Sequence, residues 1–362
     1  MLCAAAWAAC AGDPAPRDAE PASTPLPAAV AGTGVAAGVT IDPFWPQPLP
    51  DGRMLGEIGG LHVDGQDHVW VLSRPRTLDA YDTYAAATPP RADCCVAAPP
   101  VIEFDPEGNL VQAWGGPGDG YEWPENEHGI FVDAAGSVWI GGNGANDHQI
   151  LKFTRDGTFQ MQIGRAGQST GSNDTANLNR PANMMVHEPS GELVVADGYQ
   201  NRRVIVFDAA TGAYRRHWGA YGNVPDDAAP RDRTTEGPGD PQFNLVHGIT
   251  VDHRDRIYVA DRGNKRIQVF DADGKFLDLW EGFGTPWALA FDKRDQTIWM
   301  CDGDAGRVFH FALDGKILGS FGSDGPAPGQ LHQSHGIAVD SQGAVYVAET
   351  VNQRIQKFVL KK

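Results

Sequence analysis

Apolar and polar residues alternate in short runs along most of the chain, and turns rich in Asp, Gly or Ser separate these runs. One example is HGITVDHRDRIYVADR, which starts at His247 and contains an apolar run, a polar turn and a second apolar run. A third run such as RIQVF follows in most segments, and a fourth, such as LGSFGSDG, often ends in Gly. Alternation with a period of two predicts half-buried strands, so each segment predicts four short antiparallel β-strands.

Six segments of this kind follow one another. The equivalent inner-strand positions are Gly59, His128, Ala182, His247, Trp287 and His335. Six repeats of four antiparallel strands predict an all-β fold, a six-bladed β-propeller. The sixth segment ends after its third strand. Because a ring of sheets must hide its edges, we expect an N-terminal strand near residues 39–44 (VTIDPF) to close it.

The composition agrees with a sheet-rich domain over residues 38–362. The 362 residues include 44 Gly and 26 Pro, and 41% are hydrophobic, which is enough for a sizeable core. The formal net charge of −17 repels phosphate backbones and anionic membranes, which argues against a nucleic-acid partner. The five cysteines form no CxxC pair, which argues against a thiolate zinc site. Cys94 and Cys95 are adjacent, and the sequence leaves their bonding state open.

Residues 1–37 differ from the rest of the chain. The segment MLCAAAWAACAGDPAP is a short run of small apolar residues that ends at Cys10, and it resembles the end of a bacterial lipoprotein signal. Residues 11–37 are rich in Ala, Pro and Gly, which is typical of a flexible tether. We therefore expect an exported protein, periplasmic or anchored to the outer membrane, whose only membrane contact is a lipid on Cys10.

Histidine heads the inner strand of alternate repeats. The heptads EHGIFVD, VHGITVD and SHGIAVD place His128, His247 and His335 at equivalent positions of repeats 2, 4 and 6. Such positions lie about 120° apart around the axis of a six-fold ring. Three converging imidazoles predict a Zn²⁺ site with an open fourth position, as in catalytic zinc sites. Duplication of one ancestral His is the simpler alternative, but it gives no reason for strict alternation.

A second set of polar residues ends the second strands of the repeats. Arg74 follows VWVLS, Tyr199 follows VVADG and Arg262 follows IYVAD. In a propeller these strand ends lie on the same face as the starts of the inner strands, so we expect the three side chains above the histidines. Arg suits a bidentate grip on a carboxylate. A Tyr beside two cations and Zn²⁺ is expected to have a lowered pKa and to act as a base.

Two resemblances to known families support these assignments. The segments from His247 to Phe270 and from His335 to Phe358 resemble NHL repeats. The chain also resembles peptidyl-α-hydroxyglycine α-amidating lyase. This likeness lies in VLSRPR around Arg74, EHGI at His128, ADGYQNRRVIVF around Tyr199, VHGITV…VADRGNKRIQVF at His247 and Arg262, and SHGIAVD at His335.

The resemblance implies a role for each matched residue. His128, His247 and His335 would bind zinc, Tyr199 would be the base, and Arg74 and Arg262 would hold the substrate. The implied activity is that of a carbon–nitrogen lyase. It splits an N-acyl hemiaminal of the α-hydroxyglycine type into an amide and glyoxylate. The substrate would be a peptide amide or a small-molecule amide.

Three departures from the family pattern are visible. The family holds a structural Ca²⁺ through main-chain carbonyls that match Leu61 and Ile130 and through an Asp, but Gly336 occupies the Asp position here, which argues against calcium. A family disulfide beside the Tyr is absent, since Gln200 follows Tyr199. An insertion, residues 75–99, follows Arg74, and we expect it on the active face as a lid or specificity element.

Two other functions compete with a lyase. Propellers are common interaction scaffolds, so a non-enzymatic NHL binding module is one alternative. A metal-dependent hydrolase is the other, because zinc-activated water attacks esters and lactones. The alternating histidines favour an enzyme over a binding module. Product analysis distinguishes the two enzymes, because a hydrolase incorporates water into its product and a lyase does not.

Overall fold

The computed structural model describes residues 38–229 and 240–360. These residues belong to one compact unit that covers Gly32–Lys362. The leader, the tether and Cys10 lie outside the described residues. No helix within the described ranges is long and apolar enough to cross a membrane.

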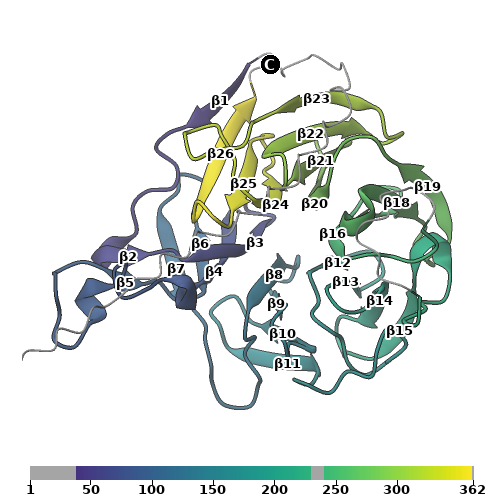
Figure 1. Cartoon of the computed structure of the whole chain (residues 1–362), viewed down its shortest axis with the longest axis horizontal. Helices are drawn as coiled ribbons and strands as arrows, with labels where there is room; N and C mark the ends of the chain where they lie inside the picture. Colours follow the sequence, from purple (N-terminus) through teal and green to yellow (C-terminus); the bar gives the residue numbers. More distant parts are fainter. Residues whose placement is uncertain (1–37, 230–239, 361–362) are drawn as a thin grey trace, which may run out of the picture. The chain divides into compact units, whose positions relative to one another are not determined.

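Six four-stranded antiparallel sheets form the blades of a ring (Figure 1). Blade 1 contains β3 (Glu57–Val63), β4 (Val69–Arg74), β6 (Val101–Phe104) and β7 (Leu110–Trp114). Blade 2 contains β8 (Glu127–Val132), β9 (Val138–Gly142), β10 (Gln149–Phe153) and β11 (Phe159–Gly164). Blade 3 contains β12 (Asn183–His187), β13 (Glu192–Asp197), β14 (Arg203–Asp208) and β15 (Tyr214–Trp218).

The other three blades repeat this order. Blade 4 contains β16 (Val246–Val251), β17 (Ile257–Asp261), β18 (Arg266–Phe270) and β19 (Phe276–Trp280). Blade 5 contains β20 (Pro286–Asp292), β21 (Thr297–Asp302), β22 (Arg307–Ala312) and β23 (Ile317–Phe321). Blade 6 contains β24 (Ser334–Val339), β25 (Val345–Glu349), β26 (Arg354–Leu360) and β1 (Val39–Asp42). The first strand of each repeat lies nearest the axis in Figure 1, as the sequence predicts.

The ring is closed by the N-terminal strand. β1 pairs antiparallel with β26, with Val39 opposite Leu360 and Asp42 opposite Lys357. The prediction of a closing strand near residues 39–44 is therefore confirmed. Val39 and Ile41 pack against the core between blades 5 and 6, so the pairing also covers apolar surface.

A repeated Asp ends most inner strands and holds the turn to the core. In blade 2 the Oδ1 atom of Asp133 accepts the backbone N–H of Ser137, and its Oδ2 accepts the indole N–H of Trp139. The same carboxylate-to-aromatic bond joins Asp64 to Trp70, Asp252 to Tyr258 and Asp340 to Tyr346. These aromatic rings are almost fully buried, so the bond satisfies a polar group that would otherwise be costly to bury.

A second repeated device fixes the loops on the opposite face. Asp261, at the end of β17, accepts hydrogen bonds from the Arg266 guanidinium and from the backbone N–H of Asn244. Both ionised side chains are fully buried. Blades 3 and 6 repeat the pair as Asp197–Arg203 and Glu349–Arg354. Loss of one partner of such a buried pair typically costs about 3–5 kcal/mol. In blade 4 the pair therefore holds the loop that leads into His247.

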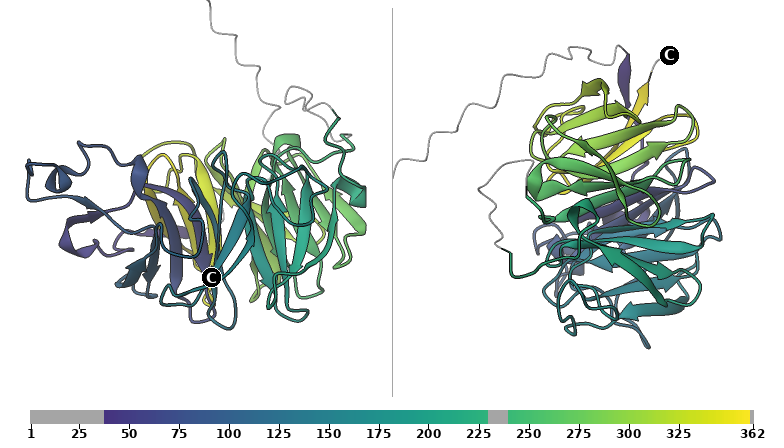
Figure 2. Two further views of the ribbon diagram at one scale, coloured as in Figure 1. Left: turned by 90° about the horizontal axis from the view of Figure 1, so that it is seen from below. Right: turned by 90° about the vertical axis from the view of Figure 1, so that its right-hand side faces the viewer.

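The insertion after Arg74 does not lie over the axis of the ring. It contains the short helices η2 (Pro75–Thr77) and η3 (Tyr84–Ala86) and the strand β5 (Val96–Ala97), which pairs in parallel with β2 (Arg53–Met54). Figures 1 and 2 show this dark blue segment projecting outward from the edge of blade 1. The expectation of a lid is wrong for most of the insertion, because the β2–β5 pairing draws it away. Within it, Cys94 and Cys95 form a disulfide.

Candidate metal centre

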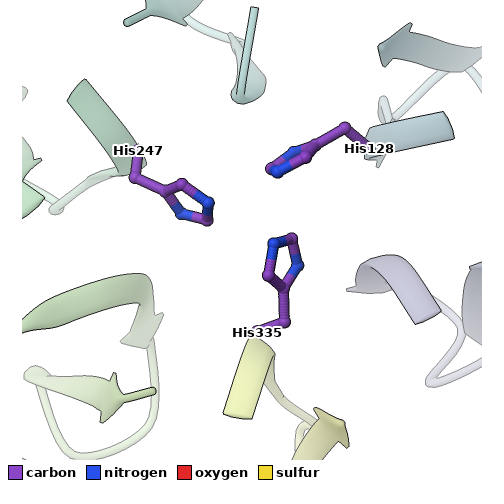
Figure 3. Close-up of side chains that lie close together, drawn as sticks. All are labelled: His128, His247 and His335. Carbon is purple, nitrogen blue, oxygen red and sulfur yellow. The ribbon is translucent and has the colours of Figure 1, made fainter. Parts of the chain in front are cut away.

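Three histidines from alternate blades converge at one mouth of the ring. His128 lies on β8, His247 on β16 and His335 on β24, and Figure 3 shows the three rings pointing toward a common centre. One nitrogen from each ring lies within 4.8 Å of the other two. All three residues are buried. The structure therefore brings together the three residues that the sequence predicts as metal ligands.

The neighbouring blades orient two of these rings. The Nδ1 atom of His128 donates to the Ala182 carbonyl at 2.6 Å, and Nδ1 of His247 donates to the Trp287 carbonyl at 2.5 Å. A carbonyl only accepts, so each bond assigns the proton to Nδ1 and leaves Nε2 with its lone pair. Ala182 and Trp287 occupy the equivalent position in the next blade. The blades without His therefore supply backbone carbonyls to the blades with His.

The glycine after each His makes this contact sterically feasible. A Cβ atom at Gly129 would lie 2.7 Å from the Ala182 carbonyl oxygen, and one at Gly248 would lie 2.9 Å from that of Trp287. These are the oxygens that the histidines contact. The His-Gly pair in the repeat is thus explained by the close approach of the next blade.

The third ring follows the same plan with weaker geometry. Gly59 of blade 1 is the counterpart of Ala182 and Trp287, and its carbonyl favours the charged form of His335. Nδ1 of His335 nevertheless has no hydrogen-bond partner among residues 38–229 and 240–360. We therefore count Gly59 as a neighbour of His335 and not as a bonded partner.

The surroundings keep the three imidazoles neutral. Burial is the main cause that holds the pKa of His128 and His247 well below the usual value, and repulsion from the other histidines and the arginines adds to it. Burial, together with Arg74 and Arg262, lowers the pKa of His335 to about 3. Neutral imidazole is the form that binds metal ions, so the site is set up for a cation without competition from protons at neutral pH.

Tyr199 lies at the centre of this arrangement. Its hydroxyl oxygen is 2.9 Å from Nε2 of His128 and 3.1 Å from Nε2 of His247. A phenol has one proton, and both nitrogens are acceptors, so it can donate to only one of them at a time. The nitrogen and oxygen lone pairs at this centre therefore outnumber the protons that could bond them. Such an excess of acceptors is typical of a site that binds a cation. The three nitrogens fit Zn²⁺, which takes three protein ligands in catalytic sites.

The pKa of Tyr199 differs in direction from the sequence-based expectation. Burial raises the pKa of the phenol, and this outweighs Arg262, Arg74 and a hydrogen bond from Asn143, all of which lower it. The prediction of a lowered pKa is therefore wrong for the protein groups acting alone. The two guanidiniums do act in the expected direction, but burial has the larger effect.

Arg74 is buried beside the histidines. Its Nε donates to the Glu127 carbonyl at 2.7 Å, and its Nη1 pairs with the Glu57 carboxylate at 3.0 Å. Its charge lowers the pKa of all three histidines, so it lies close to the centre. The insertion that follows does not displace it.

Arg262 is the third polar residue, after Arg74 and Tyr199, that the sequence predicts near the histidines. It begins the short helix η5 (Arg262–Asn264), and its guanidinium lies 3.1 Å from the centroid of the Trp287 ring. It also hydrogen bonds the Tyr199 phenol. The Trp287 ring in turn lies edge-on to His335 and is tilted against His247. Trp287 therefore supports Arg262 with its side chain and His247 with its carbonyl.

A shared backbone hydrogen bond explains why these side chains meet. The N–H of Tyr199 donates to Arg180 and that of Arg262 donates to Leu245, each two residues ahead of the inner-strand position. The same bond joins Asn143 to Asn126 in blade 2. Asn143 thus occupies the place of Tyr199 and Arg262 in its own blade. Sequence reasoning missed it, although its position after the second strand was a usable signal.

The predicted calcium ligands do not form a comparable site. Leu61 and Gly336 line a cavity of only about 10 Å³ beyond the histidines, which is about the space of one water molecule. Ile130 is absent from its lining. A Cβ at Gly336 would lie 2.9 Å from Cβ of Leu61, so a carboxylate side chain has no room there. Apart from the three histidines, no group of His, Cys, Asp and Glu suited to a metal occurs in the described ranges. These residues do not fit Ca²⁺.

Comparison with known proteins places these features in context. The sequence profile of the family described as NHL repeat matches residues 243–270 and 332–358, the segments that contain His247 and His335. Residues 243–270 and 332–358 are therefore NHL repeats within a six-bladed β-propeller. Human NHL repeat-containing protein 3 is 29% identical over 277 residues, which cover 72% of this propeller chain and 73% of the human protein.

Other relatives of this propeller carry the names of amidating enzymes. Peptidyl-alpha-hydroxyglycine alpha-amidating lyase 1 of Drosophila melanogaster is 26% identical over 285 residues, which cover 72% of this chain. Peptidylglycine alpha-amidating monooxygenase of Rattus norvegicus is 27% identical over 256 residues and 64% of this chain. The match spans 48% of the fly protein and 23% of the rat protein. A solved streptogramin B lyase shares the fold, with a TM-score of 0.55, 14% identity and coverage of 91% of this chain and 100% of the other.

Proposed function

We propose that this NHL-repeat propeller is a zinc-dependent lyase that converts an N-acyl hemiaminal of the α-hydroxyglycine type into an amide and glyoxylate. The observation that carries the proposal is the placement of the Tyr199 hydroxyl, within hydrogen-bonding distance of two of the three predicted metal ligands. The relatives named as amidating lyases support the reaction class. The buried histidines support a metal site.

Tyr199 is the proposed base. An ion held by the three histidines would supply Lewis-acid chemistry and make a coordinated hydroxyl more acidic. With such an ion bound, His128 and His247 would no longer accept from the phenol, and Arg262 and Asn143, which hydrogen bond the phenol, both favour the phenolate. Tyr199 then takes the proton of the substrate hydroxyl. The C–O bond becomes a carbonyl, the C–N bond breaks, and Tyr199 passes this proton to the nitrogen of the departing amide.

Arg74 and Arg262 are the proposed binding residues for the substrate carboxylate. Both guanidiniums reach the same mouth and act electrostatically on the histidines and on Tyr199. They form a cationic mouth on a chain whose net charge is −17, so an anionic substrate is drawn to this mouth and not to the rest of the surface. A fixed carboxylate would hold the hydroxyl and the scissile C–N bond in register with Tyr199.

Product analysis of the zinc-loaded protein tests the proposal. N-benzoyl-α-hydroxyglycine should give benzamide and glyoxylate in equal amounts, above the rate in buffer alone. In ¹⁸O-water the benzamide should contain no label, because the lyase adds no water. A protein with one zinc per chain that releases neither product would overturn the proposal. Release of benzoic acid would instead identify the metal-dependent hydrolase.

We also propose that residues 1–37 direct export and that Cys10 is lipidated. The support is the small-residue leader that ends at Cys10 and the Ala/Pro/Gly-rich segment after it. The test is labelling with a palmitate analogue in a bacterial host. Label on the wild type that is lost in Cys10→Ser supports the anchor, and equal labelling of the two proteins contradicts it.

A further inference from the structure

A second pocket adjoins the mouth between blades 4 and 5. It has a volume of about 170 Å³, and Arg262 forms part of its wall. Its other lining residues are Asn244, Leu245, Gly263, Lys265, Thr285 and Asp304. Pockets for whole drug-sized ligands measure roughly 300–1,000 Å³, so this one suits a single chemical group. Arg262 also contacts Tyr199 and Trp287, which places the pocket directly beside the predicted metal centre.

The lining contains a buried donor without an acceptor. Asn244 is only 6% exposed, and its side-chain Nδ2 has no hydrogen-bond partner within the described part of the chain. Leaving such a group unsatisfied typically costs about 1–3 kcal/mol, so a ligand acceptor there would be favoured. Gly263 leaves space next to it, since a Cβ at that position would lie 2.8 Å from Nδ2.

The charged residues of the pocket favour an anion. Arg262 and Lys265 contribute two cations to the lining, and Asp304 contributes one carboxylate. Among the described lining residues cations therefore outnumber carboxylates, whereas the chain as a whole has a formal net charge of −17. Guanidinium, ammonium and amide N–H groups are all donors, and a carboxylate is the small group that accepts from several donors at once.

We propose that this pocket is a carboxylate-binding subsite, formed by Asn244 and Lys265 with Arg262 as the wall shared with the metal centre. Resting on the proposed function, the occupant is a second carboxylate at the far end of the substrate's acyl group. The substrate class is then an N-acyl hemiaminal with a dicarboxylic acyl chain, such as glutaryl. A free small carboxylate has the same chemistry and is the other source.

Calorimetric binding of glutarate to the zinc-loaded protein tests the subsite itself. Asn244→Leu and Lys265→Gln should each weaken binding at least about tenfold, as expected for loss of one hydrogen bond to a charged group. Asp304→Asn should strengthen it, because it removes the one carboxylate among the described lining residues. Lys275→Gln, which makes the same charge change at an exposed position in the turn between β18 and β19, is the matched control. Absent binding, or binding that Asn244→Leu and Lys265→Gln leave unchanged, overturns the proposal.

Substrate competition separates the two sources of carboxylate. The ratio of kcat/KM for N-glutaryl- over N-benzoyl-α-hydroxyglycine should be about ten in the wild type and fall toward one in Lys265→Gln. A wild-type ratio near one together with specific glutarate binding assigns the pocket to a free carboxylate and overturns the assignment to the acyl group. A protein inert to both substrates refutes the lyase, while the glutarate measurement still decides the pocket.

Discussion

The even-numbered and odd-numbered blades contribute different parts of the same site. Blades 2, 4 and 6 present His128, His247 and His335 as side chains. At the equivalent position, blades 3 and 5 present the carbonyls of Ala182 and Trp287. The fold repeats six times, whereas a histidine occurs once in each unit of two blades, and a carbonyl of the next blade bonds that histidine in two of the three units.

Repeats without His therefore also contribute to the site. A backbone carbonyl cannot be recognised in a side-chain pattern, yet it decides which nitrogen of His128 and of His247 faces the centre. Glycine is required on the ligand side, because the carbonyl of the next blade approaches within 3 Å of where a Cβ would lie. Substitutions can distinguish the ligand, base and support roles, and we expect their effects to decrease in that order.

Loss of a ligand from an even blade should have the largest effect. His247→Ala removes one of the three proposed metal ligands, and we expect more than about a 100-fold loss of zinc affinity, since loss of an outer-shell partner alone costs roughly 10–100-fold. Activity should disappear with the metal. Zinc content per chain and glyoxylate release measure the two effects. His253→Ala, an exposed His of the same blade, should retain both.

Loss of the base from an odd blade should abolish turnover while the metal stays. Tyr199→Phe keeps the ring and removes the hydroxyl, and we expect kcat to fall roughly 10²–10⁴-fold, the usual range for a general base. Zinc content should match the wild type. Tyr214→Phe in the same blade, on a half-exposed ring, is the control. If Tyr199→Phe keeps full activity, another group is the base.

Displacing the Trp287 carbonyl of blade 5 should lower the zinc affinity although all three histidines are retained. In Gly248→Ala the new Cβ lies 2.9 Å from the Trp287 carbonyl oxygen, so the bond to His247 must lengthen. We expect roughly a 10–100-fold lower zinc affinity and about 1–3 kcal/mol lower stability. Competition with a metal chelator and denaturant unfolding measure these. Gly65→Ala, where a Cβ meets nothing within 4 Å, should change neither. Unchanged zinc affinity in Gly248→Ala would show that the carbonyl is dispensable.

Loss of the hydrogen bond from Asn143 to Tyr199 should have the smallest effect on activity. Asn143 hydrogen bonds the phenol and lowers its pKa. In Asn143→Ala the pKa of Tyr199 therefore rises, and the rising limb of the pH–rate profile should move to higher pH. A single hydrogen bond is worth about 0.5–1.5 kcal/mol, so kcat at neutral pH should fall roughly 2–10-fold. A fall in kcat without a shift of the profile would indicate a merely structural role.

The ring and the ligands of the site were predictable because they follow from strand register. Alternation of apolar residues predicts the blades, and the phase of the His heptads predicts three converging rings. The pattern could not show the Ala182 and Trp287 carbonyls or the link from Asn143 to Tyr199, which depend on packing between blades. The direction of residues 75–99 was mispredicted because the β2–β5 pairing has no sequence signature in two-residue strands.

The closure of the ring links the site to the order in which the chain assembles. His335 stands in the one blade made from both ends of the described chain, since β24–β26 take β1 as their outer strand. His128 and His335 are separated in the sequence by most of the propeller, so they meet only when the ring is complete. An ion that binds the closed ring and not the open chain shifts the equilibrium toward closure. The rate of zinc binding during refolding would therefore report the rate of ring closure, the last step of assembly.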